Sequence, residues 1–229
     1  MLRISKFEHW RFLQLTVFLL IFWIVFPLLG QKLFVQILTQ LFVLNSILVV
    51  LSTEKKAAGL KKLVWILWII GLLASLSALF PLQQELKKLC LELESVFHFL
   101  VLMICIGIIL SVVFRAKRIT VDGIFAAFVA YLLLAFAFGL IYNFMIIQSP
   151  DSFKGALSTN NHFGDVIYFS LVTIATLGYG DIVPATNAAR TIATIEAVIG
   201  QFYVAVIVAV LVGLFISQRM ESDQKNKSQ

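Results

Sequence analysis

The sequence predicts an all-α integral membrane protein with six transmembrane helices and a shorter helix that enters the membrane without crossing it. Three observations lead to this fold class. Apolar residues make up 61% of the 229 residues and charged residues 13%, whereas about a quarter of a soluble domain is charged. The mean hydropathy is +0.99. The apolar residues also gather into runs about long enough to cross ~30 Å of hydrocarbon.

Six apolar runs qualify as membrane spans, and they cover residues 12–29, 33–51, 63–80, 96–114, 123–147 and 191–218. The first run follows Arg3, Lys6 and Arg11, as the core of a signal peptide follows basic residues. It is too long for such a core, and no small-residue cleavage site comes after it. We therefore expect the first run to remain as a span.

Lys and Arg residues are distributed unevenly over the connecting segments. Six spans place both termini on one side, and the segments on that side carry 13 of the 18 Lys and Arg residues. The positive-inside rule places this side in the cytoplasm. We expect a multi-pass protein of the plasma or inner membrane, with the segment between spans five and six facing outward.

Three regions are predicted along the chain. Residues 1–114 form a four-helix transmembrane domain, residues 115–218 form a second domain that contains spans five and six, and residues 219–229 form a short cytoplasmic tail. The polar end of this tail is expected to be disordered. Residues 81–95 carry leucines at helical spacing, so we interpret them either as a short surface helix or as an extension of span four.

The segment between spans five and six contains an apolar run that is too short to cross. Residues 163–175, FGDVIYFSLVTIA, have a helical period, but a helix of this length is only about 20 Å long. It can enter from outside and stop midway, so that TLGYGDIVP must lead back out. Non-helical backbone at this depth is tolerated only inside protein or beside a water-filled path.

The two glycines of TLGYG alternate with larger residues. Successive carbonyl oxygens point toward one axis when the backbone alternates in handedness, and Gly178 and Gly180 adopt the left-handed positions at little cost. The side chains of Leu177 and Tyr179 then point away from that axis, while Thr176 adds a hydroxyl at the inner end. The C-terminal end of the preceding short helix favours a cation there.

Residues 173–181, TIATLGYGD, resemble the selectivity filter and the end of the pore helix of potassium channels, and the likeness extends over residues 115–219. The resemblance implies K+ ions but no other cofactor. The implied K+ ligands are Thr176, Leu177, Gly178 and Tyr179, with Gly180 completing the ion-binding filter and Thr173 and Asp181 supporting it. Because the chain holds one copy of the filter, the resemblance also implies a homotetramer.

Some residues around the motif depart from the family pattern. Tyr168 and Phe169 stand where many relatives carry tryptophan. A phenylalanine cannot donate a hydrogen bond to Tyr179, although Tyr168 can donate one to Asp181. The support behind the filter is therefore expected to differ from that of the common pattern.

The last span contains two further candidates. Glu196 is the only acidic residue in any span, and an acid inside the membrane is a functional candidate by default. We expect it to form a hydrogen bond to the back of the pore helix or filter rather than to bind ions. Gly200 follows Gly180 by twenty residues, where relatives often have a hinge glycine. A packing role is the alternative, and the sequence leaves both open.

Six spans with a pore loop between the fifth and sixth resemble the layout of voltage-gated channels. A voltage sensor needs charges that move through the field, yet residues 96–114 contain no Lys or Arg. Arg115, Lys117 and Arg118 come only at the cytoplasmic end of this run. We therefore expect the first four spans to form a structural shell, and the channel not to be steeply voltage-gated.

The leading hypothesis is a potassium-selective channel of prokaryotic type that conducts K+ passively, with membrane lipids and K+ but no nucleic acid as partners. One alternative is a potassium transporter subunit, although those chains carry four degenerate pore repeats. Another is a non-selective cation channel, although such relatives usually lose the tyrosine or the following acid. An enzyme is the least favoured class, because the sequence shows no catalytic triad, metal-ligand cluster or nucleotide-binding loop.

Overall fold

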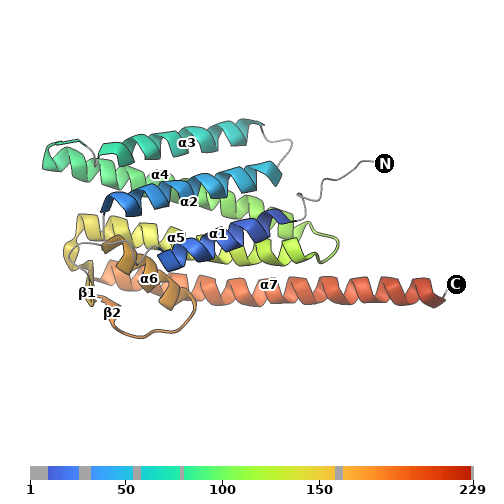
Figure 1. Ribbon diagram of the computed structural model, residues 1–229. Helices are drawn as coiled ribbons and strands as arrows, with labels where there is room; N and C mark the ends of the chain where they lie inside the picture. Colours follow the sequence, from blue (N-terminus) through green and yellow to red (C-terminus); the bar gives the residue numbers. More distant parts are fainter. Residues whose placement is uncertain (1–9, 26–31, 54–57, 78–79, 158–161, 228–229) are drawn as a thin grey trace.

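A computed structural model describes residues 10–25, 32–53, 58–77, 80–157 and 162–227 of the chain (Figure 1). Its helices are α1 (Arg11–Val25), α2 (Lys32–Thr53), α3 (Ala58–Leu76), α4 (Gln84–Phe114), α5 (Val121–Gln148), α6 (His162–Ile174) and α7 (Asn187–Lys227). A single 3-10 turn, η4 (Pro150–Ser152), leads into the strand β1 (Phe153–Gly155), which pairs with β2 (Ile182–Pro184) in a two-stranded antiparallel sheet.

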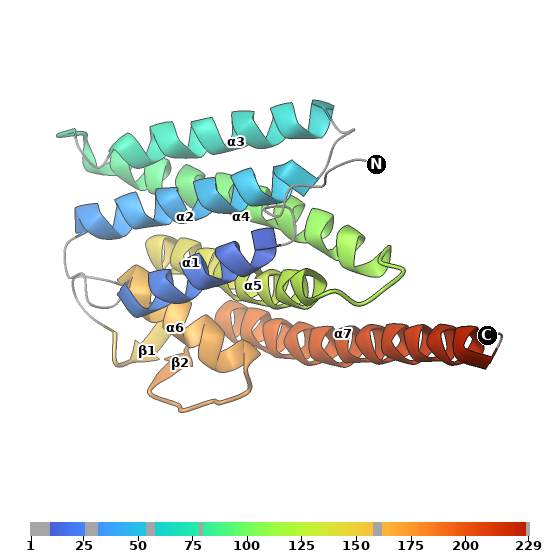
Figure 2. The same cartoon turned by 45° about the vertical axis from the view of Figure 1, so that its right-hand side comes forward.

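The long helices lie side by side in one bundle. In Figures 1 and 2, α2, α3 and α4 form one side, α5 lies between them and α7, and α6 and the small sheet gather at one end, beside the first turns of α7. The remainder of α7 runs along the bundle and projects beyond it. The start of α1 and the end of α7 point to the same end, which is opposite to the sheet.

Aromatic rings connect the first helices to α5. Phe42 of α2 lies between two partners, with ring centroids 4.9 Å from Phe22 of α1 and 4.3 Å from Phe136 of α5. All three side chains are buried, and each aromatic side chain of this size removes a large apolar area from its surroundings. The four-helix region and α5 therefore share one core.

Five of the described helices are long and apolar enough to cross a membrane, namely those within Gln36–Thr53, Ala58–Leu76, Gln84–Phe114, Val121–Gln148 and Asn187–Glu221. The first predicted span is described only as the 15 residues of α1, which extend about 22 Å. Its predicted end at 26–29 lies outside the described residues, as do Arg3, Lys6 and residues 78–79 of span three. The count of six spans therefore stays a prediction.

Two helix boundaries bear on the sequence-based expectations. One resolves an alternative that the sequence left open, and the other corrects an expectation. Residues 84–95 continue α4 as one helix from Gln84 to Phe114, so the extension is correct and the separate surface helix is not. The tail was expected to be disordered, and this is wrong for its described part, because α7 continues to Lys227. No Gly or Pro follows Gly213, so nothing in the sequence stops a helix that has already begun.

Candidate functional site

The backbone of the TLGYGD segment, residues 176–181, alternates in handedness. Thr176 has φ 58°, Gly178 has φ 56° and Gly180 has φ 79°, whereas Leu177 and Tyr179 keep negative φ. This alternation turns successive carbonyl oxygens toward one side. The sequence predicted the two glycines but missed Thr176, because a left-handed threonine is rare. The two-residue spacing of Gly178 and Gly180, extended back to residue 176, was the signal that could have predicted it.

The inner end of this segment is fixed by the last turn of α6. Leu177 and Gly178 both donate their backbone N–H to the carbonyl oxygen of Val172, at 2.9 and 3.3 Å. Thr176 N–H donates to the carbonyl oxygen of Thr173 at 3.0 Å, so Thr173 supports the segment through its backbone. The chain thus leaves the helix in a tight, hydrogen-bonded turn whose carbonyl end is electronegative.

The side chains of the segment are open to solvent in a single chain. Leu177 is 56% exposed and Tyr179 66% exposed, and a Cβ atom added to Gly178 or Gly180 would meet nothing within 4 Å. The alternating backbone therefore lies on the outside of the chain. The rest of the described chain therefore leaves the side chains of Leu177 and Tyr179 largely uncovered.

Asp181 is held from the side by Tyr168 of α6. The phenol oxygen of Tyr168 donates to the Asp181 carboxylate at 2.8 Å, as the sequence predicted. This hydrogen bond raises the pKa of Tyr168 above its ordinary value, because it favours the protonated phenol. Phe169 is buried and packs against Tyr142 and Phe153, with ring centroids 5.2 and 5.1 Å away.

Glu196 is fully buried and joins three helices. Tyr142 of α5 donates to its Oε2 at 2.5 Å, and Ser170 of α6 forms a hydrogen bond with its Oε1. Ser170 Oγ also lies 2.6 Å from the carbonyl oxygen of Ala135 in α5. The expected hydrogen bond to the back of α6 is present. Tyr142 was missed, because its 54-residue separation leaves no pattern in the sequence.

A second tyrosine of α5 reaches the end of α6. The phenol oxygen of Tyr131 donates to the carbonyl oxygen of Ile174 at 2.9 Å, and its ring lies 5.6 Å from that of Tyr203 in α7. Tyr203 in turn donates to the carbonyl oxygen of Ala127 at 2.6 Å. These contacts fix the point where α6 ends and the TLGYGD segment begins, and sequence reasoning did not find them.

Gly200 packs directly against the last residue of α6. A Cβ atom at this position would lie 2.5 Å from Ile174 Cγ1 and 2.9 Å from the Ile174 carbonyl oxygen. The helix α7 continues without interruption on both sides of Gly200. The packing role that the sequence left open is therefore visible as a contact, while the hinge role stays a prediction.

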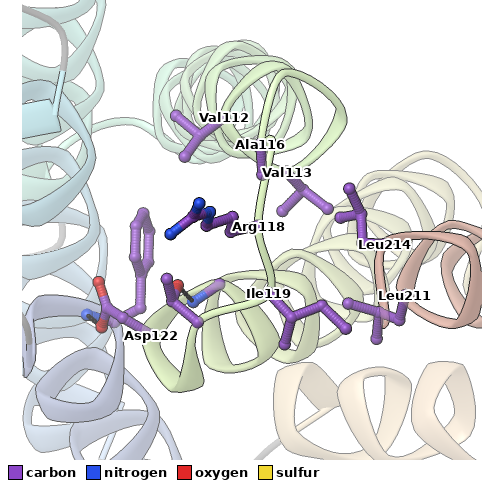
Figure 3. Close-up of a pocket in the computed structure, with 11 residues that line it drawn as sticks. Val112, Val113, Ala116, Arg118, Ile119, Asp122, Leu211 and Leu214 are labelled. Atoms are coloured by element: carbon purple, nitrogen blue, oxygen red, sulfur yellow. Dashed lines mark hydrogen bonds between the residues drawn. The ribbon is translucent and has the colours of Figure 1, made fainter. Parts of the chain in front are cut away.

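The segment between α4 and α5, residues 115–120, contains three basic residues, is called the basic elbow here, and contacts the C-terminal part of α7. Arg118 lies 3.4 Å from Glu221, and Gln218 donates to the carbonyl oxygen of Ile119 at 3.4 Å. A cavity of about 100 Å³ lies beside this elbow, with Phe12 of α1 and Leu211 and Leu214 of α7 in its wall (Figure 3). The elbow is thus in contact with the end of the last helix.

Within the described residues, no group of three or more His, Cys, Asp or Glu side chains is placed to hold a metal ion. The candidate ion ligands are instead the backbone carbonyl oxygens of residues 176–180, where the backbone alternates in handedness. Backbone carbonyls replace the hydration shell of a monovalent cation such as K+ without carrying a formal charge.

Part of the sequence matches a known protein family. Residues 125–217, from α5 to α7, match the family described as "Ion channel". The long apolar helices indicate a multi-pass membrane protein, and the part of it from α5 to α7 is similar to ion channels. The matched range lies inside the predicted second domain, residues 115–218, whose outer bounds stay a prediction.

More particularly, part of this chain is similar to parts of potassium channels. It is 34% identical over 87 residues to the rice protein "Two pore potassium channel c" (36% of this chain, 19% of the relative). It is 50% identical over 40 residues to "Two-pore potassium channel 4" of Arabidopsis thaliana (18% and 13%). It is 34% identical over 77 residues to "Small conductance calcium-activated potassium channel-like protein 3" of Caenorhabditis elegans (33% and 11%). The matches thus span less than a fifth of each relative, and no solved structure matches significantly.

Proposed function

We propose that the protein is a potassium-selective channel that conducts K+ passively through a pore shared by four identical chains. The observation that carries the proposal is the alternating backbone of residues 176–180, with φ of 58°, 56° and 79° at every second residue. Such a backbone serves little purpose in an ordinary surface loop, but it is what a row of ion-binding carbonyls requires. The similarity to potassium channels supports the same function.

In this proposal the K+ ligands are the carbonyl oxygens of residues 176–179, together with the Thr176 hydroxyl at the inner end. Gly180 completes the filter, and Asp181 lies at its outer mouth. Tyr168 and Glu196 are supporting residues, because each forms a hydrogen bond that links α6 to a neighbouring element. The ions are the substrate, and no further cofactor is proposed.

Four chains are proposed because one chain supplies only one wall of the pore. Leu177 and Tyr179 are exposed in the single chain, and only 11% of the apolar part of α7 is buried, against 67% of α5. A closed ring of four copies would cover these side chains and bring four carbonyl rows to one axis. The proposed assembly is therefore a homotetramer in contact with membrane lipids.

The proposed topology has six spans and cytoplasmic termini in a plasma or inner membrane, in a channel of prokaryotic type. Its support is the uneven distribution of Lys and Arg. The start of α1 and the end of α7 also lie toward one end of the bundle (Figure 2), as an even number of crossings requires. The first four helices are proposed to act as a shell and not as a voltage sensor, because α4 has no Lys or Arg between Val96 and Phe114.

The proposal is tested by ion flux from proteoliposomes that contain the purified chain. We expect efflux of K+ but not of Na+, blocked by external barium, which matches K+ in size but carries twice the charge. Gly178→Ala should abolish selective flux, because an L-residue at φ 56° is strained. Gly107→Ala is the matched control, since Gly107 lies in α4 with nothing within 4 Å of an added Cβ. Equal K+ and Na+ efflux from the wild type would contradict the proposal.

A further inference from the structure

The chain after the TLGYGD segment is hydrogen-bonded to the chain that precedes α6. Phe153 pairs with Pro184, Lys154 with Val183 and Gly155 with Ile182. Two backbone hydrogen bonds flank this pairing. The N–H of Ala156 donates to the carbonyl oxygen of Asp181 at 2.8 Å, and the N–H of Ala185 donates to that of Ser152 at 2.8 Å. The outer end of the proposed filter is therefore attached to β1.

Gly155 is the point of closest approach between the two segments. Its φ is +113°, a region that L side chains rarely adopt. A Cβ atom at this position would overlap the carbonyl oxygen of Asp181 and come 2.9 Å from the carbonyl carbon. Both obstacles are backbone atoms, so no rotation of a side chain relieves them. Only glycine allows this contact.

The strand β1 is itself anchored to the inside of the domain. Phe153 is buried, and its ring lies 5.3 Å from Tyr142 of α5 and 5.1 Å from Phe169 of α6. Tyr142 is also the hydrogen-bond donor to Glu196 of α7. A continuous set of packed and hydrogen-bonded groups thus runs from the buried acid of α7 to β1, and from β1 to the carbonyl of Asp181.

Asp181 is consequently held at two atoms from two elements. Tyr168 binds its carboxylate at 2.8 Å, and the backbone N–H of Ala156 binds its carbonyl oxygen at 2.8 Å. The second bond fixes the Asp181–Ile182 peptide plane. This plane adjoins the peptide that carries the carbonyl of Gly180, the last left-handed residue of the segment. Phe169 has no polar atom with which to support the segment, and its ring instead packs against Phe153 of β1.

We propose that residues 152–156 are a brace that positions the outer end of the filter, and that Gly155 is a positioning residue for the outermost ion site. This inference rests on the proposed function. Without the brace, the Asp181 peptide can rotate and the neighbouring carbonyl leaves the ion path. Because K+ at the outer site opposes that rotation, loss of the brace weakens conduction most when external K+ is low.

The most selective test removes only the backbone N–H hydrogen of Ala156. Replacing Ala156 by lactic acid through nonsense suppression converts its amide to an ester, so the donor to Asp181 is lost while the side chain is kept. The matched control is lactic acid at Ala188, whose amide lies in the first turn of α7, where N–H groups have no partner within the helix. Gly155→Ala is a second variant, with Gly107→Ala as its control.

In full-length tetramers, the ester at Ala156 should speed the decline of K+ current in low external K+ by about two- to tenfold, the effect of one net hydrogen bond. High external K+ should restore the wild-type rate, which a merely structural role would not give. Gly155→Ala should show the same K+-dependent decline or fail to assemble. If K+ current in low external K+ declines at the same rate with the ester at Ala156 as with the ester at Ala188, the proposed brace is wrong.

Amide exchange separates failure of the brace from failure of the proposed function. In the wild-type protein, the Ala156 amide should exchange slowly, as a hydrogen-bonded group does, whether or not the protein conducts. Fast exchange at Ala156 would overturn the brace even if K+ current is present. Absence of K+ current from a protein with a protected Ala156 amide would contradict the proposed function, and with it the role of the brace in conduction.

Discussion

At the scale of single residues, Glu196 shows how an acid is accommodated among apolar helices. A buried carboxyl group without partners is costly, and both of its oxygens have one, Tyr142 for Oε2 and Ser170 for Oε1. The partners come from α5 and α6, so the group connects these two helices to α7. We therefore expect Glu196 to stabilise the protein through two hydrogen bonds, one in which it accepts and one in which it donates.

Glu196→Gln should therefore keep the fold and most of the current, because an amide accepts from Tyr142 and donates to Ser170. Glu196→Ala should lower the free energy of unfolding by about 1–3 kcal/mol, since it leaves both hydroxyl groups buried without that partner. Thermal unfolding in detergent and current in bilayers measure the two effects. If glutamine is as damaging as alanine, the negative charge itself is required and the hydrogen-bond account is wrong.

Gly200 allows the packing and hinge roles to be separated. Gly200→Ala should destabilise the protein by about 1–3 kcal/mol, the usual effect of overpacking, because its Cβ would come 2.9 Å from the Ile174 carbonyl oxygen. Gly213→Ala in the same helix is the control, since nothing lies within 4 Å of its added Cβ. An unchanged thermal midpoint combined with a lowered open probability would instead indicate a hinge.

At the scale of elements, the helix α4 is the place where the proposal predicts no voltage sensor. No Lys or Arg lies between Val96 and Phe114, and the nearby Arg118 forms an exposed ion pair with Glu221. Exposed pairs of this kind contribute little, with a median of about 0–1 kcal/mol. Charges at the headgroup level also experience little of the transmembrane potential.

Current through the channel should thus vary almost linearly with voltage in symmetric K+. Neutralising Arg115, Lys117 and Arg118 together should leave the shape of this relation nearly unchanged, because these residues are exposed at the end of α4 or just beyond it. Voltage ramps on reconstituted protein provide the measurement. A steep sigmoidal activation that becomes shallower in the triple variant would show that the bases enter the field.

Elements with a strong repeating pattern were predictable, and those made by long-range contacts were not. The 13-residue helix α6 follows from an apolar run too short to cross. The sheet does not, because β1 is only Phe-Lys-Gly and is defined by its pairing with a segment that follows the filter. Glu196 was recognisable as an unusual acid, whereas Tyr142 looks like any other aromatic residue of an apolar helix.

At the scale of the whole molecule, the single chain leaves two parts of its surface uncovered. The alternating backbone of residues 176–180 lies on the outside, and α7 has the least buried apolar window of the five long helices. Native mass spectrometry of the detergent-purified protein should therefore give four chains. A stable monomer or dimer that still conducts K+ would rule out the shared pore.

The most direct test of the account is the reversal potential of reconstituted protein with equal concentrations of K+ and Na+ on opposite sides of a bilayer. If carbonyl oxygens at 176–179 replace the hydration shell of K+, the reversal potential should lie far from zero on the side that K+ selectivity demands. External barium should block this current, and Gly178→Ala should abolish it. A wild-type reversal potential near zero would show that the segment does not select K+, and would contradict the central claim.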